Sequence, residues 1–149
     1  MKKFKFSLDK VLVQREIQVD IAQKEFLDAE RELDQEIQKL NQMISMKESA
    51  LLQRSEAVQG STSWANSVEQ INTFLTGQDF RIKKQSERLL VLKKVVESRR
   101  EILQDALTAA KMIERLREKK KAQYYREVLN NEQKEIDELS VIRFSKTEN

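Results

Sequence analysis

LVQREIQVDIAQKEFLDAERELDQEIQKL, residues 12–40, is the stretch that decides the fold, because its apolar side chains return every seven residues. One column of them runs through Leu12, Val19, Phe26, Leu33 and Leu40. A period of seven keeps one side of an α-helix turned toward a partner helix over many turns. The stretch therefore predicts a long helix that packs against a second helix as a coiled coil.

The seven-residue period continues through most of the chain, which contains no proline and two glycines. We expect the first column to pass to neighbouring positions, at Ile37, Ile44, Leu51 and Val58. A second column occupies the later half of the chain, at Val68, Leu75, Ile82, Leu89, Val96, Leu103 and Ala110. The predicted fold is all-α: a long antiparallel two-helix coiled-coil hairpin that forms a single domain over residues 1–149.

Capping residues and glycine place the first helix and the turn. Ser7 precedes the periodic pattern and can accept hydrogen bonds from the free amides of a first helical turn. Glycine and hydroxyl residues cluster only after Val58. We therefore expect helix one at about residues 8–58 and the turn at about residues 59–66.

The second helix should cover about residues 67–142. Its start has two candidate signals: Ser67 and Gln70 form a capping box, and Ser63 could instead cap an extra turn that carries Trp64. Sequence alone leaves this choice open.

Gly77 lies inside the predicted second helix. A short helix could end at Thr76 with Gly77 as its C-terminal cap, or the helix could continue at a cost of about 1 kcal/mol relative to alanine. Because Leu75 and Ile82 keep one column across the glycine, we expect the helix to continue.

Charge favours a folded-back chain. Residues 16–36 carry eight acidic and two basic side chains, a net charge of −6, whereas residues 81–100 carry eight basic and two acidic ones, a net charge of +6. A turn near residue 62 places residue i opposite roughly residue 124 minus i, which brings the two segments together. Exposed ion pairs contribute only about 0–1 kcal/mol each, so the charges should fix orientation and register more than stability.

The end of the second helix has no counterpart in the first. Beyond about residue 117 it outruns helix one and should project as a C-terminal single-helix overhang. A helix is normally stabilised by packing rather than by propensity alone. The overhang is therefore a candidate partner-binding segment.

Composition argues against an enzyme. The chain is 39% hydrophobic, 36% charged and 6% aromatic, which is typical of long helices rather than of a domain with a thick core. It has no cysteine, no histidine and no glycine-rich phosphate loop. We therefore expect no catalytic residue, no metal site and no cofactor.

The sequence also predicts a cytoplasmic protein. The absence of cysteine fits a reducing compartment. The basic start MKKFKFSLDKVLV is interrupted by Asp9 and Lys10, so we expect no signal peptide. No apolar run approaches the roughly 18 residues of a transmembrane helix.

The basic run at residues 81–100 has three interpretations. A nucleic-acid-binding helix would add aromatic side chains for base stacking, and none occurs from Arg81 to Arg100. We therefore expect no nucleic-acid partner. The run is better interpreted as a solvated face that complements helix one, or as a surface for an acidic protein.

Both ends of the chain carry more specific motifs. The N-terminal motif is F-x-F-x-L-x-x-x-L-x-x-R, at Phe4, Phe6, Leu8, Leu12 and Arg15. The C-terminal motif comprises Glu118, Lys119, Lys120, Tyr124, Tyr125, Glu132, Gln133, Lys134, Asp137, Glu138 and Arg143. With a Gly/Ser turn and Trp64 in the middle, the chain resembles the flagellar export protein FliJ family. The resemblance covers about residues 4–30 and 115–143 by motif, and the middle by heptad character.

This resemblance implies a non-enzymatic component of the flagellar type III protein export apparatus, which serves flagellum biogenesis, motility and chemotaxis. FliJ proteins look like the central stalk of rotary ATPases. The implied partners are the flagellar export ATPase and the cytoplasmic domain of the export gate, with export chaperones as further partners of a chaperone or chaperone escort. Association with the membrane-embedded apparatus would then be peripheral and through these partners only.

The residues themselves leave other functions open. A generic coiled-coil scaffold that self-associates is the main alternative, and a basic helical nucleic-acid binder is a further one. Binding to a purified export ATPase, concentration-dependent mass and salt-dependent affinity for nucleic acid distinguish the three.

Aromatic side chains near the two termini are the candidate anchors for a partner, because aromatics are enriched among interface hot spots. They are Phe4, Phe6, Tyr124 and Tyr125. The ordinary alternative makes Phe6 part of a hydrophobic staple and packs one tyrosine on helix one. The overhang adds a polar cluster of candidate contacts at Glu132, Gln133, Lys134, Asp137 and Glu138. Trp64, at the turn, either plugs the tip of the hairpin or presents an apolar spot to a partner.

Overall fold

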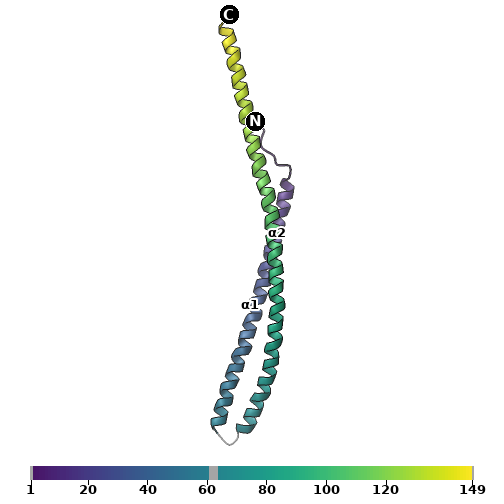
Figure 1. Cartoon of the computed structure of the whole chain (residues 1–149), viewed down its shortest axis with the longest axis vertical. Coiled ribbons are helices and arrows are strands. Elements are labelled where there is room, and N and C mark those ends of the chain that lie inside the picture. The colour runs from purple at the N-terminus through teal and green to yellow at the C-terminus, as the bar shows by residue number, and fades with distance from the viewer. Residues whose placement is uncertain (1, 61–63, 149) are drawn as a thin grey trace. The chain divides into compact units, whose positions relative to one another are not determined.

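The structure is a computed structural model that describes residues 2–60 and 64–148, the side chain of Trp64 excepted. It contains two helices, α1 at Asp9–Gly60 and α2 at Trp64–Thr147 (Figure 1). The described residues contain no strand. The predicted all-α hairpin of two antiparallel helices is confirmed.

The helix bounds differ slightly from the expected ones. Helix α1 continues through Gln59 and Gly60, and α2 begins at Trp64 and ends at Thr147 instead of near residue 142. The turn was expected at residues 59–66, but residues 59–60 belong to α1 and residues 64–66 to α2. The remaining residues, 61–63, lie outside the described residues. Ser63, the residue that could cap an extra turn carrying Trp64, lies outside the described residues with them.

The chain divides into two compact units. Unit 1 contains Met1–Asp20 and Gln104–Asn149, and unit 2 contains Ile21–Leu103. Each unit therefore pairs one stretch of α1 with an antiparallel stretch of α2.

Polar pairs between the helices define the register of unit 2. Arg99 Nη1 lies 3.2 Å from Glu25 Oε2, and Lys47 Nζ lies 2.6 Å from Asp79 Oδ1. Nearer the turn, Arg54 Nη1 donates a hydrogen bond of 3.0 Å to Asn72 Oδ1. All three pairs fall within a few positions of the predicted register. The first of them joins the acidic and basic segments, as expected from the charge pattern.

One prediction about the seam between the helices is wrong. The column was expected to pass to Ile37, Ile44, Leu51 and Val58, but Ile37 is only half-buried and the other three are exposed. The seam instead keeps the period of Leu12 and continues through half-buried Lys47 and Arg54, next to buried Ala50 and half-buried Ala57. Lysine and arginine can occupy a seam because their aliphatic stems pack while their charged ends reach out. Here those ends reach Asp79 and Asn72.

Helix α2 passes through Gly77 without a break, as expected. Neither glycine of the described chain has a positive φ, so Gly77 does not form a left-handed helix cap. The column that includes Leu75 and Leu89 is buried on both sides of it.

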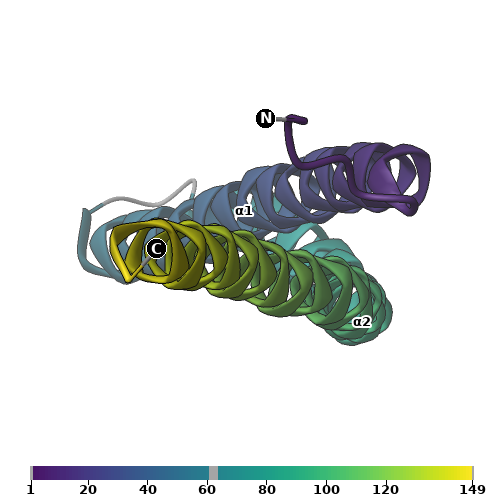
Figure 2. The same ribbon diagram turned by 90° about the horizontal axis from the view of Figure 1, so that it is seen from above.

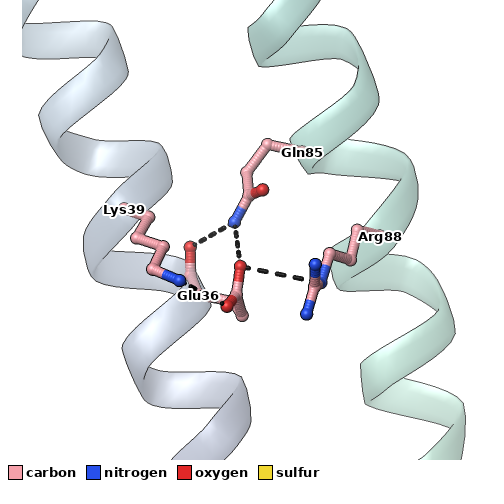
Figure 3. Close-up of polar contacts among 4 residues, drawn as sticks. All are labelled: Glu36, Lys39, Gln85 and Arg88. Carbon is pink, nitrogen blue, oxygen red and sulfur yellow. Dashed lines mark hydrogen bonds and ion pairs between the residues drawn. The ribbon is translucent and has the colours of Figure 1, made fainter.

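A buried acidic residue lies in the middle of the unit 2 seam. Glu36 is 5% exposed, and Gln85 of α2 donates hydrogen bonds to its carboxylate Oε2 at 2.7 Å and to its backbone carbonyl at 2.9 Å. Lys39 Nζ lies 2.9 Å from the other carboxylate oxygen, and Arg88 Nε lies 3.7 Å from Oε2 (Figure 3). These four residues are called the Glu36 cluster below. The hydrogen bonds from Gln85 and Lys39, followed by the positive charge of Arg88, hold the pKa of Glu36 below its ordinary value.

A second buried glutamine lies one heptad before Gln85. Gln78 is 2% exposed and donates a hydrogen bond of 2.8 Å to the backbone carbonyl of Met43. Arg81 Nε donates in turn to the Gln78 side-chain oxygen at 2.9 Å. The two glutamines occupy the other column of the α2 seam, which the apolar periodicity of the sequence does not reveal.

Replacing Gly77 by alanine should stabilise the protein by up to about 1 kcal/mol, because alanine loses less backbone entropy in a helix. The new Cβ would lie 3.2 Å from Arg81 Nη1, the far end of a flexible side chain that can move aside. Urea unfolding of Gly77→Ala and the parent measures the difference, with exposed Ser98→Ala as the control for helix propensity. A clear loss of stability would contradict an unbroken helix at Gly77.

Glu36→Gln should change the pH dependence of stability. The folded-state pKa of Glu36 is depressed, so its carboxylate adds stability that is complete above the ordinary value of 4.5 and is lost as the pH falls through the lower folded value. We expect the parent to be more stable than Glu36→Gln at neutral pH, and the difference to shrink as the solution is acidified below that value. Thermal unfolding across pH measures it. The exposed Glu48→Gln serves as control, and a difference independent of pH would refute the assignment.

Candidate partner-binding site

The N-terminal strap, residues 2–8, is a non-helical segment that leads into α1 (Figure 2). It lies against α2 within unit 1, where the Tyr124 hydroxyl donates a hydrogen bond to the backbone carbonyl of Lys2. The rings of Phe4 and Tyr124 have centroids 5.7 Å apart and planes inclined by 47°. A bond of 3.2 Å from the Asp9 amide to the Phe6 carbonyl then leads the strap into the helix.

Phe6 is the most buried side chain of the strap, at 8% exposure. A groove of about 250 Å³ lies beside it, between the strap and α2. Its lining combines aromatic rings with charged side chains: Phe4, Lys5, Phe6, Ser7, Lys120, Gln123, Tyr124 and Glu127. This groove is lined by residues from both candidate motifs.

Tyr125 differs from the other three aromatic candidates because it is 49% exposed. Its ring meets Tyr124 edge-on, with centroids 5.5 Å apart and planes at 75°. Phe4 and Tyr124 are half-buried. The structure therefore brings all four aromatics into unit 1, where Phe4 and Tyr124 fasten the strap and Tyr125 remains accessible. Their role toward a partner stays a prediction.

The part of α2 that pairs with α1 stops at the level of Asp9, the first residue of α1. Asp9 Oδ1 lies 3.9 Å from Arg117 Nε, and beyond this level only the strap covers α2, as far as Tyr124. From Leu129 to Glu148 every residue is exposed. Figure 1 shows this part of α2 continuing past the N-terminal strap with no second helix beside it. The predicted single-helix overhang is thus confirmed.

The overhang carries large apolar side chains that are more than half exposed: Leu129, Ile136, Leu139, Val141, Ile142 and Phe144. Leu129, Ile136 and Leu139 have the spacing of one helix face, because positions seven and ten residues apart lie within a quarter turn. A contiguous exposed apolar stripe on a helix is the usual form of a partner-binding surface.

The polar cluster predicted at residues 132–138 lies on the same exposed stretch of α2. Gln133 Nε2 donates a hydrogen bond of 3.0 Å to Asp137 Oδ1, one helical turn away. Glu132, Lys134 and Glu138 are also exposed. The cluster can therefore contact a partner without any rearrangement of the helix.

Trp64 is the remaining candidate residue. It is the first residue of α2 and belongs to unit 2, whereas the aromatic anchors and the polar cluster belong to unit 1. Its side chain lies outside the described atoms, so its predicted role at the tip stays a prediction.

The basic run of α2 is partly engaged inside unit 2. Arg88 and Arg99 pair with glutamates of α1, and the Arg100 guanidinium lies 5.7 Å from the centroid of the Phe26 ring. Lys84 Nζ lies 4.6 Å from the centroid of Phe80 on its own helix. These contacts agree with the interpretation of the run as a face that complements helix one.

The described residues contain no group of three or more acidic side chains that could hold a metal ion. Over residues 2–60 and 64–148, neither helix has an apolar stretch long enough to cross a membrane.

The comparisons with known proteins agree with this arrangement. Residues 4–149 match the family described as "Flagellar FliJ protein". No curated protein matches the sequence. A solved structure from Chlamydia trachomatis, CT670, described as a YscO homolog, has a similar fold: the TM-score is 0.73, the identity is 20%, and the alignment covers 94% of each chain.

At that identity the structural likeness establishes the fold alone. The family match covers nearly the whole chain, including residues 4–8 of the strap, the four candidate aromatic residues and the overhang. The chain therefore belongs to the flagellar FliJ family, components of the type III protein export apparatus.

Proposed function

We propose that this protein is a non-enzymatic coiled-coil stalk or chaperone escort that links the flagellar export ATPase to the cytoplasmic domain of the export gate. It acts by binding and by transmitting movement along its helices. In this proposal its partners catalyse the chemical reactions, and this protein does not.

The observation that carries this proposal is the exposed apolar overhang of α2. Six large apolar side chains in about twenty residues are more than half exposed, and such a concentration of exposed apolar surface on one segment supports a partner-binding role. The adjacent accessible Tyr125 and the polar cluster provide the aromatic anchor and the polar rim that interfaces commonly combine. The overhang is therefore the part of unit 1 that we assign to the ATPase.

The second partner requires a second surface. The strap groove in unit 1 and Trp64 in unit 2 are the two candidates for contact with the gate or with export chaperones. In this proposal the protein works in the cytoplasm and reaches the membrane-embedded apparatus only through those partners. A generic scaffold would instead self-associate through the overhang, and sedimentation of the purified chain distinguishes the two functions.

Deletion of residues 130–149 should weaken ATPase binding at least tenfold, or about 1.4 kcal/mol. The hairpin should stay folded, because every residue from Leu129 to Glu148 is exposed. Titration with the purified export ATPase measures the affinity, and circular dichroism checks the fold. Unchanged affinity of a folded truncation would move the ATPase site to another surface.

A finer test separates the apolar stripe from the rest of the overhang. Ile136→Ser with Leu139→Ser should weaken ATPase binding at least tenfold, or about 1.4 kcal/mol, because it removes the apolar contacts of one face. Lys134→Ser with Glu138→Ser places the same number of serines on the opposite face and should change the affinity less. Equal losses in the two variants would show that the stripe is not the contact.

A further inference from the structure

Unit 2 contains the pattern Gln-x-x-Arg twice, seven residues apart. Gln85 and Arg88 form the pair that holds the Glu36 carboxylate. Gln78 and Arg81 form the same pair one heptad earlier on α2, and there Arg81 donates a hydrogen bond to Gln78. One buried acidic side chain of α1 therefore has two chemically equivalent binding positions on α2.

The contacts of the two glutamines with α1 repeat with the same period. Gln85 donates to the backbone carbonyl of Glu36, and Gln78 donates to the backbone carbonyl of Met43, seven residues later. A shift of α2 by one heptad along α1 brings Gln78 and Arg81 to Glu36 and brings Gln85 to the carbonyl of Ala29. The shift amounts to about 10 Å at a rise of 1.5 Å per residue.

The apolar seam tolerates this shift because both of its columns repeat every seven residues. Counting heptads from the Glu36 contacts places Val96 at about the level of Ala29 in the observed register, and Leu89 takes that level in the shifted register. Val96 and Leu89 are both buried in the observed seam. The acidic and basic segments still overlap, since each is about three heptads long.

The polar pairs at the edges of the seam distinguish the two registers. A shift separates Glu25 from Arg99, Lys47 from Asp79 and Arg54 from Asn72. Because both helices continue into unit 1, the shift also separates the Tyr124 hydroxyl from the Lys2 carbonyl. The two ion pairs among them are partly exposed, and pairs of that kind are individually weak. They favour the observed register without excluding the other.

The turn can follow the shift. A displacement of one heptad moves the middle of the turn by half a heptad toward the N-terminus, to about residues 57–59, so the last turn of α1, which ends at Gly60, unwinds in the second register. Glycine adopts the backbone conformations of tight turns at no steric cost. In the observed structure a Cβ at Gly60 would meet nothing within 4 Å, so the close packing of the seam does not require this glycine.

We propose that unit 2 is a coiled coil with two registers, in which Glu36 binds Gln85 and Arg88 in the observed register and Gln78 and Arg81 in a second register one heptad away. Such one-step sliding of one packed element past another is a known form of switching transition. Because Glu36 is bound at one or the other of two positions seven residues apart, the shift takes place in a single step of one heptad.

Disulfide reporters test the two registers directly, because the chain has no cysteine of its own. Ala29→Cys with Val96→Cys reports the observed register, and Ala29→Cys with Leu89→Cys reports the shifted one. The rate of intramolecular closure in a glutathione buffer is measured for each pair. Ala29→Cys with the exposed Glu101→Cys gives the background rate.

Matched variants then remove one binding position at a time. Gln85→Leu with Arg88→Ala should raise the closure rate of the shifted pair about tenfold, since Glu36 is then held only in the second register. Gln78→Leu with Arg81→Ala should reduce that rate to background and leave the observed pair unchanged. Equal closure of the shifted pair in the two variants, or closure at background rate in both, would overturn the proposal.

A distance measurement covers the case in which a double variant does not fold. Spin labels on cysteines at the exposed Asp34 and Leu90, which lie near one level in the observed register, should give one main distance in the parent. The single variant Arg88→Ala should add a second, longer distance. A single unchanged distance in folded Arg88→Ala and folded Gln85→Leu would refute the second register.

Discussion

Each helix of this protein buries two adjacent columns of side chains on one face, and the seam where the two faces meet is the interaction on which everything else depends. A seam this thin tolerates few polar residues unless each one is matched, because an unpaired buried charge destabilises strongly. Glu36 is matched by an amide, an ammonium group and a guanidinium group. Buried polar contacts of this kind are best known for restricting the register of coiled coils, and in unit 2 they join a seam whose apolar residues alone would allow several alignments.

The sequence predicted the architecture because a seven-residue period has one common structural meaning. Antiparallel pairing, continuity through Gly77 and the free end of α2 follow from that period, from charge and from the unequal helix lengths, and the structure has all three. The error at Ile37, Ile44, Leu51 and Val58 came from treating the seam as apolar throughout. Lys47 and Arg54 kept the original column, and the long stems of these side chains look polar in a sequence while they pack like aliphatic ones.

The buried glutamines could not be predicted for the same reason, since an amide at a seam position does not belong to an apolar column. Extending the columns by position rather than by residue type would have found Gln78 and Gln85. The free end of α2 could be predicted because it follows from the unequal helix lengths, while the role of its residues toward a partner stays a prediction. The docking of the strap could not, since the hydrogen bond from Tyr124 to the Lys2 carbonyl depends on a backbone group that carries no sequence signal. The separate positions of the buried Phe6 and the accessible Tyr125 depend on the same packing.

The hairpin connectivity also determines how the contacts can form in time. Arg54 and Asn72 are 18 residues apart in the chain, whereas Glu25 and Arg99 are 74 apart and Lys2 and Tyr124 are 122 apart. The entropy lost on closing a loop grows with its length, so each pair closer to the turn shortens the loop that the next one must close. We therefore expect the helices to pair from the turn outward and the strap to dock last, so that the contact of Phe4 with Tyr124 forms after the two helices have paired.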